Sequence, residues 1–131
     1  MIVFNPQWVG GYCYVPLSSS REEMRRDFLA QFERGAVPEP LFHREHLQYT
    51  WRAYAIGSSV DTIYAKNPMA WGVLNLLRFD VPCTGYYTGT VVLLASNMIS
   101  EPTPLTLTHR KAIDTAIELY KAGKESMDMQ Y

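Results

Sequence analysis

The sequence predicts an α+β fold in which two amphipathic helices cover a small sheet. Two segments, 20–34 and 108–122, carry apolar residues at helical spacing. The strands expected to build the sheet are 12–16, 47–56 and 84–95, which are rich in aromatic and β-branched residues. A chain of 131 residues is long enough to bury one core, so we expect a single domain over 1–131.

The N-terminal segments are read from their turn residues and caps. The stretch NPQWVGG (5–11) is typical of a turn, and the strand after it stops at Pro16. Ser20 and Glu23 have the spacing of a capping box, which places a helix start at residue 20. Gly35 is expected to end this helix. One apolar stripe follows the helix: Met24, Phe28, Leu29 and Phe32.

The middle of the chain is less clear. Prolines make 36–40 a stiff, extended linker. Segment 47–56 fits a strand by its aromatic content, although a helical stripe through the same residues is the alternative. Ser59 is expected to cap a short helix through Lys66, and Asn67 to cap another that begins at Pro68. That second helix is apolar almost all round, which is typical of burial in a core or in lipid.

Residues 81–100 contain no charged side chain and allow two interpretations. Their length matches the roughly 17–25 residues that span a bilayer, and Gly85 and Gly89 have the G-x-x-x-G spacing of packed membrane helices. The Thr, Tyr and Val content favours a buried strand instead, in which the glycines mark a bulge or a close backbone approach. The alternative fold is therefore mostly helical, with one or two membrane-spanning helices in 68–100.

The last helix is predicted to begin at Thr108 and to end at Gly123. His109, Arg110 and Lys111 stand at its positive end, where the helix dipole disfavours cations. One interpretation is that Arg110 and Lys111 face an acidic partner, and the alternative is that solvent screens them at a cost of a few tenths of a kcal/mol. Its apolar stripe consists of Ile113, Ala116, Ile117 and Tyr120.

Composition and charge exclude several classes of function. The net charge of −1 offers no basic field for nucleic acid. Cys13 and Cys83 do not make a disulfide framework, so an intracellular, reducing compartment is expected. The first twenty residues lack both Lys and Arg, unlike a secretory or mitochondrial leader. If residues 81–100 insert into a bilayer, an organelle or a bacterial inner membrane is the alternative location.

The sequence HREH is the only cluster with metal-ligand residue types. On a helix, His43 and His46 at i,i+3 would face one way and could share a metal, with Glu45 between them. The spacing is not that of the H-E-x-x-H motif, and a third ligand would have to come from elsewhere in the fold. No nucleophile motif or phosphate loop is recognised, so we expect no catalytic residue and no cofactor.

Aromatic residues make up 13% of the chain, including nine Tyr and three Trp, which suits a protein interface. The leading hypothesis is a non-catalytic accessory or structural subunit of a larger, membrane-associated assembly. The alternatives are a small metal- or ligand-binding enzyme that uses the HREH cluster, and a compact viral inhibitor that docks on a host protein. The residues expected at the interface are Trp8, Tyr12, Trp51, Tyr54, Trp71, Tyr86, Tyr87, Arg110 and Lys111.

Overall fold

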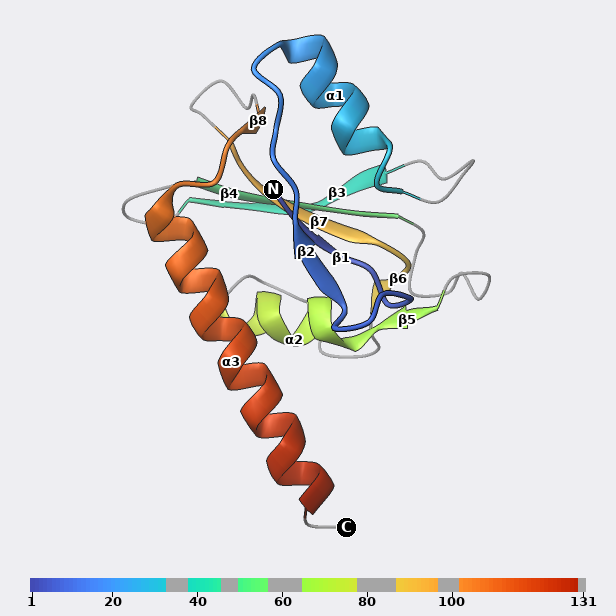
Figure 1. Cartoon of the computed structure of the whole chain (residues 1–131), viewed down its shortest axis with the longest axis vertical. Coiled ribbons are helices and arrows are strands. Elements are labelled where there is room, and N and C mark those ends of the chain that lie inside the picture. Colours follow the sequence, from blue (N-terminus) through green and yellow to red (C-terminus); the bar gives the residue numbers. More distant parts are fainter. Residues whose placement is uncertain (33–37, 46–49, 57–64, 78–86, 97–101, 130–131) are drawn as a thin grey trace.

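An antiparallel sheet with helices on both faces forms the centre of the molecule (Figure 1). The computed structural model describes residues 1–32, 38–45, 50–56, 65–77, 87–96 and 102–129, with backbone alone for 38–45, 50–56, 102 and 124–129. The strand order is β2-β1-β7-β4-β3, and β8 pairs with the end of β7. The strands are β1 (Ile2–Phe4), β2 (Tyr12–Tyr14), β3 (Pro38–Glu45), β4 (Thr50–Ile56), β7 (Val91–Ser96) and β8 (Pro102–Thr103). The α+β prediction is confirmed.

Strand β7 lies at the centre of the sheet, and all six of its residues are buried. Its register places Leu93 beside Ile2 on one side and beside Ala53 on the other. Because both faces of β7 are covered, its sequence is a continuous apolar run rather than an alternating one. This explains why the same residues resemble a membrane segment when they are read alone.

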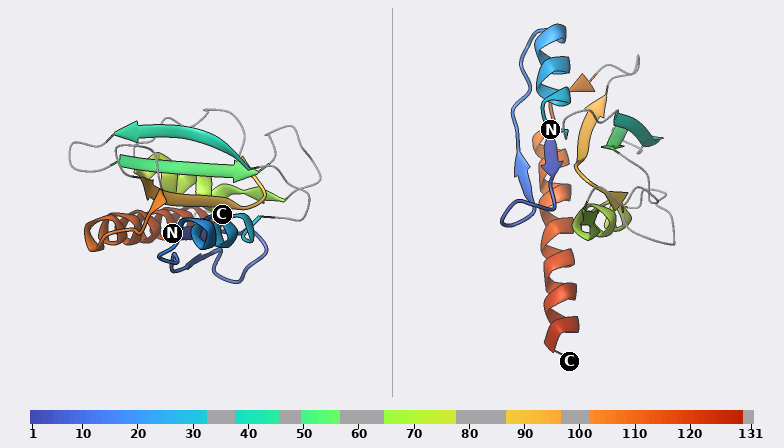
Figure 2. Two further views of the ribbon diagram at one scale, coloured as in Figure 1. Left: turned by 90° about the horizontal axis from the view of Figure 1, so that it is seen from above. Right: turned by 90° about the vertical axis from the view of Figure 1, so that its right-hand side faces the viewer.

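Two separate cores lie on the two faces of the sheet. The larger core packs α2 (Pro68–Leu76) and α3 (Leu107–Met129) against the face that carries Ile2, Phe4 and Leu93. The smaller core lies on the opposite face, where α1 (Arg21–Leu29) is located (Figure 2). Its buried members are Met1, Val3, Phe32, Val92 and Leu94.

The membrane-spanning alternative is wrong for the described residues. Residues 87–96 form β6 (Tyr87–Thr88) and β7, not a helix, and α2 has only nine residues. Helix α2 is also not buried all round, because Leu76 is 44% exposed. Within the described ranges, no helix combines the length and the apolar character that crossing a bilayer requires.

Helix α2 begins as the sequence predicts. Asn67 is its N-cap and Pro68 its first residue, and the Asn67 Oδ1 accepts a hydrogen bond from the Ala70 backbone N–H at 3.3 Å. Lys66 does not end a helix, however, because it belongs to β5 (Lys66–Asn67), which pairs with β6. Ala65 is not helical either, and residues 59–64 of the short helix predicted from Ser59 lie outside the described residues.

Gly89 follows β6 in a left-handed conformation, with φ of 72°. Its N–H donates to the Ala65 carbonyl at 2.7 Å, and its own carbonyl accepts from the Asn67 Nδ2 at 2.9 Å. The prediction of a close backbone approach at Gly89 is confirmed, whereas Gly85 lies outside the described residues.

Helix α1 is shorter than predicted. Ser20 caps it as expected, with its Oγ accepting from the Glu23 N–H, but the helix ends at Leu29 rather than near residue 34. A tighter turn follows and brings Phe32 against Phe28, with ring centroids 5.0 Å apart. Because Leu29 is 45% exposed, α1 covers the sheet through these two Phe rings rather than through the whole predicted stripe.

The predicted linker 36–40 is partly a strand. Pro38 and Pro40 belong to β3, which is the edge strand of the sheet, and the register shifts between Pro40 and Phe42. Proline lacks the N–H that a central strand donates, so edges and bulges are where a sheet tolerates it. The extended backbone was predicted correctly, but the strand was not.

Helix α3 runs through Gly123 to Met129, so the predicted helix end is wrong. Its 23 residues give it a length of about 34 Å, and its C-terminal part extends beyond the rest of the fold in Figure 1 and in the right-hand view of Figure 2. The predicted stripe is confirmed, since Ile113, Ala116 and Ile117 are buried and Tyr120 packs beside them.

Candidate functional site

The N-terminal hairpin, which consists of β1 and β2, contacts α3 through the rings of Tyr12 and Tyr14. Tyr12 and Tyr14 lie in an edge-to-face arrangement with centroids 6.5 Å apart. The Arg110 guanidinium lies 4.4 Å from the centroid of the Tyr14 ring, and the Lys121 ammonium lies 5.2 Å from that of Tyr12. Two cations of one helix therefore stack on two rings of one strand, which orders both the strand and the side chains of the cations.

Hydrogen bonds fix the Tyr14 phenol. Its hydroxyl donates to the Asp114 Oδ1 and also lies 3.4 Å from the Arg110 carbonyl oxygen. Burial, and then the hydrogen bond to Asp114, raise the pKa of Tyr14 above its usual value. Tyr14 thus stays a neutral donor at neutral pH and links β2 to α3.

Residues 5–11, which connect β1 to β2, form the tip of the hairpin, and hydrogen bonds fix their backbone. The Asn5 N–H donates to the Gly11 carbonyl at 2.9 Å, and the Trp8 N–H donates to the Asn5 carbonyl at 3.1 Å. Gly10 and Gly11 have φ of 85° and 81°, values that L-residues with side chains rarely adopt. The tip presents Trp8 at 39% and Val9 at 104% relative exposure.

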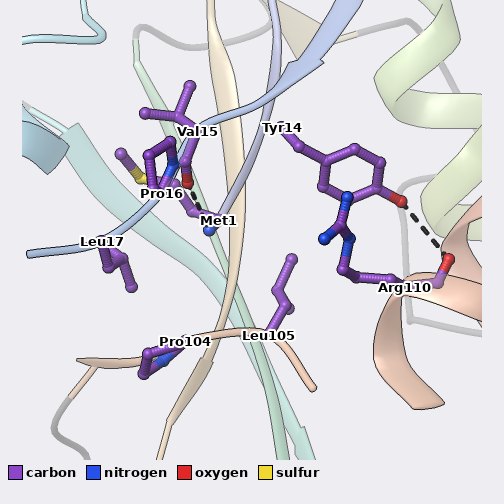
Figure 3. A pocket seen from close by; sticks show the side chains of 8 residues that line it. All are labelled: Met1, Tyr14, Val15, Pro16, Leu17, Pro104, Leu105 and Arg110. Atoms are coloured by element: carbon purple, nitrogen blue, oxygen red, sulfur yellow. Dashed lines mark hydrogen bonds between the residues drawn. The ribbon is translucent and has the colours of Figure 1, made fainter. Parts of the chain in front are cut away.

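A pocket of about 250 Å³ lies at the other end of β2 (Figure 3). One wall is the segment that leaves β2, and the opposite wall is the connection from β8 to α3. The Met1 amine lies in this pocket and donates to the Val15 carbonyl at 2.9 Å. The lining residues are Met1, Tyr14, Val15, Pro16, Leu17, Pro104, Leu105 and Arg110.

His109 completes a cap at the start of α3 that the sequence reading missed. The Thr106 Oγ1 accepts from the His109 N–H, and the His109 Nδ1 accepts from the Thr106 N–H, both at 3.2 Å. This is the reciprocal geometry of a capping box, with His in the place of the usual Glu or Gln. His109 is only 4% exposed, and burial lowers its pKa, so it adds no positive charge to this helix end.

The cap makes folding stability depend on pH. Because the folded protein holds His109 neutral below its ordinary pKa of about 6.5, the unfolded chain binds more protons in that range. The free energy of unfolding is therefore expected to fall as the pH drops below about 6.5. Burial and the charge of Arg110 lower the pKa of the Met1 amine to about 6, so this amine contributes in the same direction between about pH 6 and 8.

Urea unfolding between pH 5 and 8 checks this dependence. His109→Gln keeps an acceptor for the Thr106 N–H but does not titrate, so its stability should change less between pH 5 and 6.5 than that of the wild type. Above pH 7 both proteins should depend on pH in the same way. If the free energy of unfolding changes equally with pH in the wild type and in His109→Gln below pH 6.5, the His109 cap has no role in the pH dependence.

Of the predicted metal pair, His43 lies in the described part of the chain and His46 does not. His43 and Glu45 belong to strand β3, with His43 opposite Arg52 in register, and His46 lies outside the described residues. The helix on which a shared i,i+3 site depends is therefore not formed at His43. No group of three His, Cys, Asp or Glu that could hold a metal occurs among the described residues.

The predicted interface residues do not form one surface. Arg110 stacks on Tyr14 and Tyr12 is stacked by Lys121, both where the hairpin meets α3. Trp8 lies at the tip, and Lys111 is exposed on α3. Tyr87 is 8% exposed and belongs to the larger core.

The remaining predicted interface residues are distributed over other elements. Trp71 is half-buried in α2 and packs against the larger core. Trp51 and Tyr54 lie in β4, in register with Ala95 and Val92. Tyr86 and Cys83 lie outside the described residues, whereas Cys13 is exposed on β2.

No protein-family model, curated protein sequence or solved structure matches this chain. Function is therefore inferred from the described residues themselves. Tyr14 was not among the predicted interface residues, although its i,i+2 spacing from Tyr12 places both rings on one face of a strand. Val9 was not among them either, although the adjacent Gly-Gly pair presents it at the tip of a turn.

Proposed function

We propose that this protein is a non-catalytic accessory subunit that binds another protein through the tip of its N-terminal hairpin, residues 5–11. The observation that supports this proposal is the display of Trp8 and Val9 on a backbone that is already fixed. Trp is enriched among the residues that dominate binding energy at protein interfaces. A fully exposed Val beside it has no packing role in the described part of the fold.

The rigidity of the tip favours binding. Each group that must be ordered on association reduces affinity, and here the backbone is ordered before the partner arrives. The Asn5 side chain also accepts from the Gln7 N–H at 2.9 Å, and Met69 packs against Gly11 from α2. The tip is thus supported by its own hydrogen bonds and by a neighbouring helix.

Val9→Asp tests the proposal with little risk to the fold, because the Val9 side chain is fully exposed. The carboxylate introduced at residue 9 would be buried without a partner in the complex. It should weaken binding by about 2 kcal/mol or more, which is about 30-fold in affinity. Affinity purification from the native host identifies the partner, and titration of the purified pair measures the loss. Trp8→Ala should weaken the same complex to a similar degree.

Leu107→Asp is the matched control, since Leu107 is 69% exposed but lies at the start of α3, away from the tip. It should leave partner affinity unchanged. Val9→Asp and Leu107→Asp should both unfold near the wild-type temperature, which separates loss of binding from loss of fold. If the Val9 and Trp8 variants retain their partner at full affinity, the tip is not the binding surface.

A further inference from the structure

The pocket at the other end of β2 has no role in the proposed protein contact. It lies where β1 and β8 share the same edge of β7, with Ile2 pairing with Leu93 and Thr103 pairing with Ala95. Between these two strands the edge is interrupted, and the pocket opens beside Met1 (Figure 3). The pocket therefore exists because the order of the strands brings these segments together, and a single loop does not form it.

The walls of the pocket are aliphatic and stiff. Pro16 and Pro104 stand on opposite walls, where they offer no N–H donor and fix the local backbone. Val15, Leu17 and Leu105 supply the remaining aliphatic surface. A volume of about 250 Å³ has room for a ligand of roughly eight non-hydrogen atoms, if each takes about the 30 Å³ share of a water molecule.

Among the described residues that line the pocket, Arg110 is the only one whose side chain carries a full charge. Its side chain extends from α3 across the Tyr14 ring toward the pocket (Figure 3), and the ring supports the guanidinium at 4.4 Å. Asp114 in turn accepts from the Tyr14 hydroxyl and holds the ring in place. Among these described lining residues there is no Asp or Glu to pair with the guanidinium fork.

We infer that this pocket binds a small aliphatic carboxylate, with the carboxylate on Arg110 and the alkyl group between the two proline walls. A guanidinium matches a carboxylate with two parallel hydrogen bonds, and the aliphatic walls match an alkyl chain of four to six carbons by size. The same chemistry occurs in a free short-chain acid and in the C-terminal residue of a peptide that ends in Leu. The inference is independent of the proposed function, because the hairpin tip does not contribute to the pocket.

The test is an NMR titration of the full chain with 4-methylpentanoate, which has eight non-hydrogen atoms. Amide signals of Val15, Leu17, Leu105 and Arg110 should shift together and saturate in the millimolar range. The neutral isostere 4-methylpentanamide should bind at least tenfold more weakly. A second titration uses acetyl-Ala-Ala-Leu and its C-terminal amide, so that binding of the peptide alone would identify a protein C-terminus as the source of the carboxylate.

Arg110→Gln should weaken binding of the acid at least tenfold, and Arg110→Lys should restore part of the loss. Leu17→Trp keeps the guanidinium but fills the pocket, so it should also abolish binding. Lys121→Gln is the matched control, because Lys121 stacks on Tyr12 outside the pocket and its loss should change nothing. Equal binding of acid and amide, full affinity in Arg110→Gln, or no saturation by either carboxylate would overturn the inference.

Discussion

Replacing Asn67 with alanine is expected to lower the free energy of unfolding by about 3–5 kcal/mol, measured by urea denaturation. Asn67 is 1% exposed and makes three hydrogen bonds to three different segments. Its Nδ2 donates to the Phe4 carbonyl at 3.0 Å and to the Gly89 carbonyl at 2.9 Å, while its Oδ1 caps α2. Alanine removes all three at once and leaves buried polar backbone groups without these partners.

Asn67→Asp separates the cap from the cross-link. Aspartate is as good an N-cap as asparagine, so a cap alone would leave this variant close to wild type. Because the carboxylate cannot donate to the Phe4 and Gly89 carbonyls, we expect Asn67→Asp to be at least as unstable as Asn67→Ala. A near-wild-type midpoint for Asn67→Asp would show that the two donated bonds contribute little.

Gly72→Ala is expected to destabilise the protein by about 1–2 kcal/mol, even though alanine favours helix by about 1 kcal/mol. A Cβ at residue 72 would lie 2.5 Å from Cδ2 and 2.6 Å from Cε2 of Tyr120. Gly72 is buried where α2 meets α3, and the Tyr120 ring packs against the larger core. The ring or the helix must therefore move, and thermal unfolding would report the cost as a lower midpoint.

Gly123→Ala is the matched control, because Gly123 is also helical but, among the described residues outside its own turn of helix, no heavy atom lies within 4 Å of its Cβ position. The same substitution should there stabilise the protein, by up to about 1 kcal/mol. Adding Tyr120→Leu to Gly72→Ala should remove most of the clash, which a double-mutant cycle measures as a coupling energy. Equal effects of alanine at residues 72 and 123 would contradict the close packing of α2 on α3.

Local signals in the sequence located several elements correctly. Ser20 and Asn67 begin helices at the predicted residues, because an N-cap side chain bonds to backbone only two or three residues away. The stripe through Ile113 and Ile117 is likewise a local pattern, and it predicts which face of α3 is buried. The candidate site was predicted in part, through Trp8 and Arg110.

Signals that depend on distant residues were misread. Gly123 is a common helix end, yet α3 continues through it, and the prolines of β3 belong to a strand because that strand lies at the edge of the sheet. The pairing of His43 and His46 assumed a helix that strand pairing with β4 replaces at His43. In each case the conformation depends on segments far away in the sequence and not on the few residues around the position.

The sequence by itself determined the caps at Ser20 and Asn67 and the buried stripe of α3, because each depends on contacts within one or two helical turns. The strand and helix patterns together also predicted the α+β class. Only the tertiary structure decided that Val91–Ser96 is the buried centre of a sheet, since its apolar run is compatible with lipid until strands β1 and β4 flank it. The pocket beside Arg110 was decided in the same way. Its walls come from segments about 90 residues apart, and only the order of the strands brings them together.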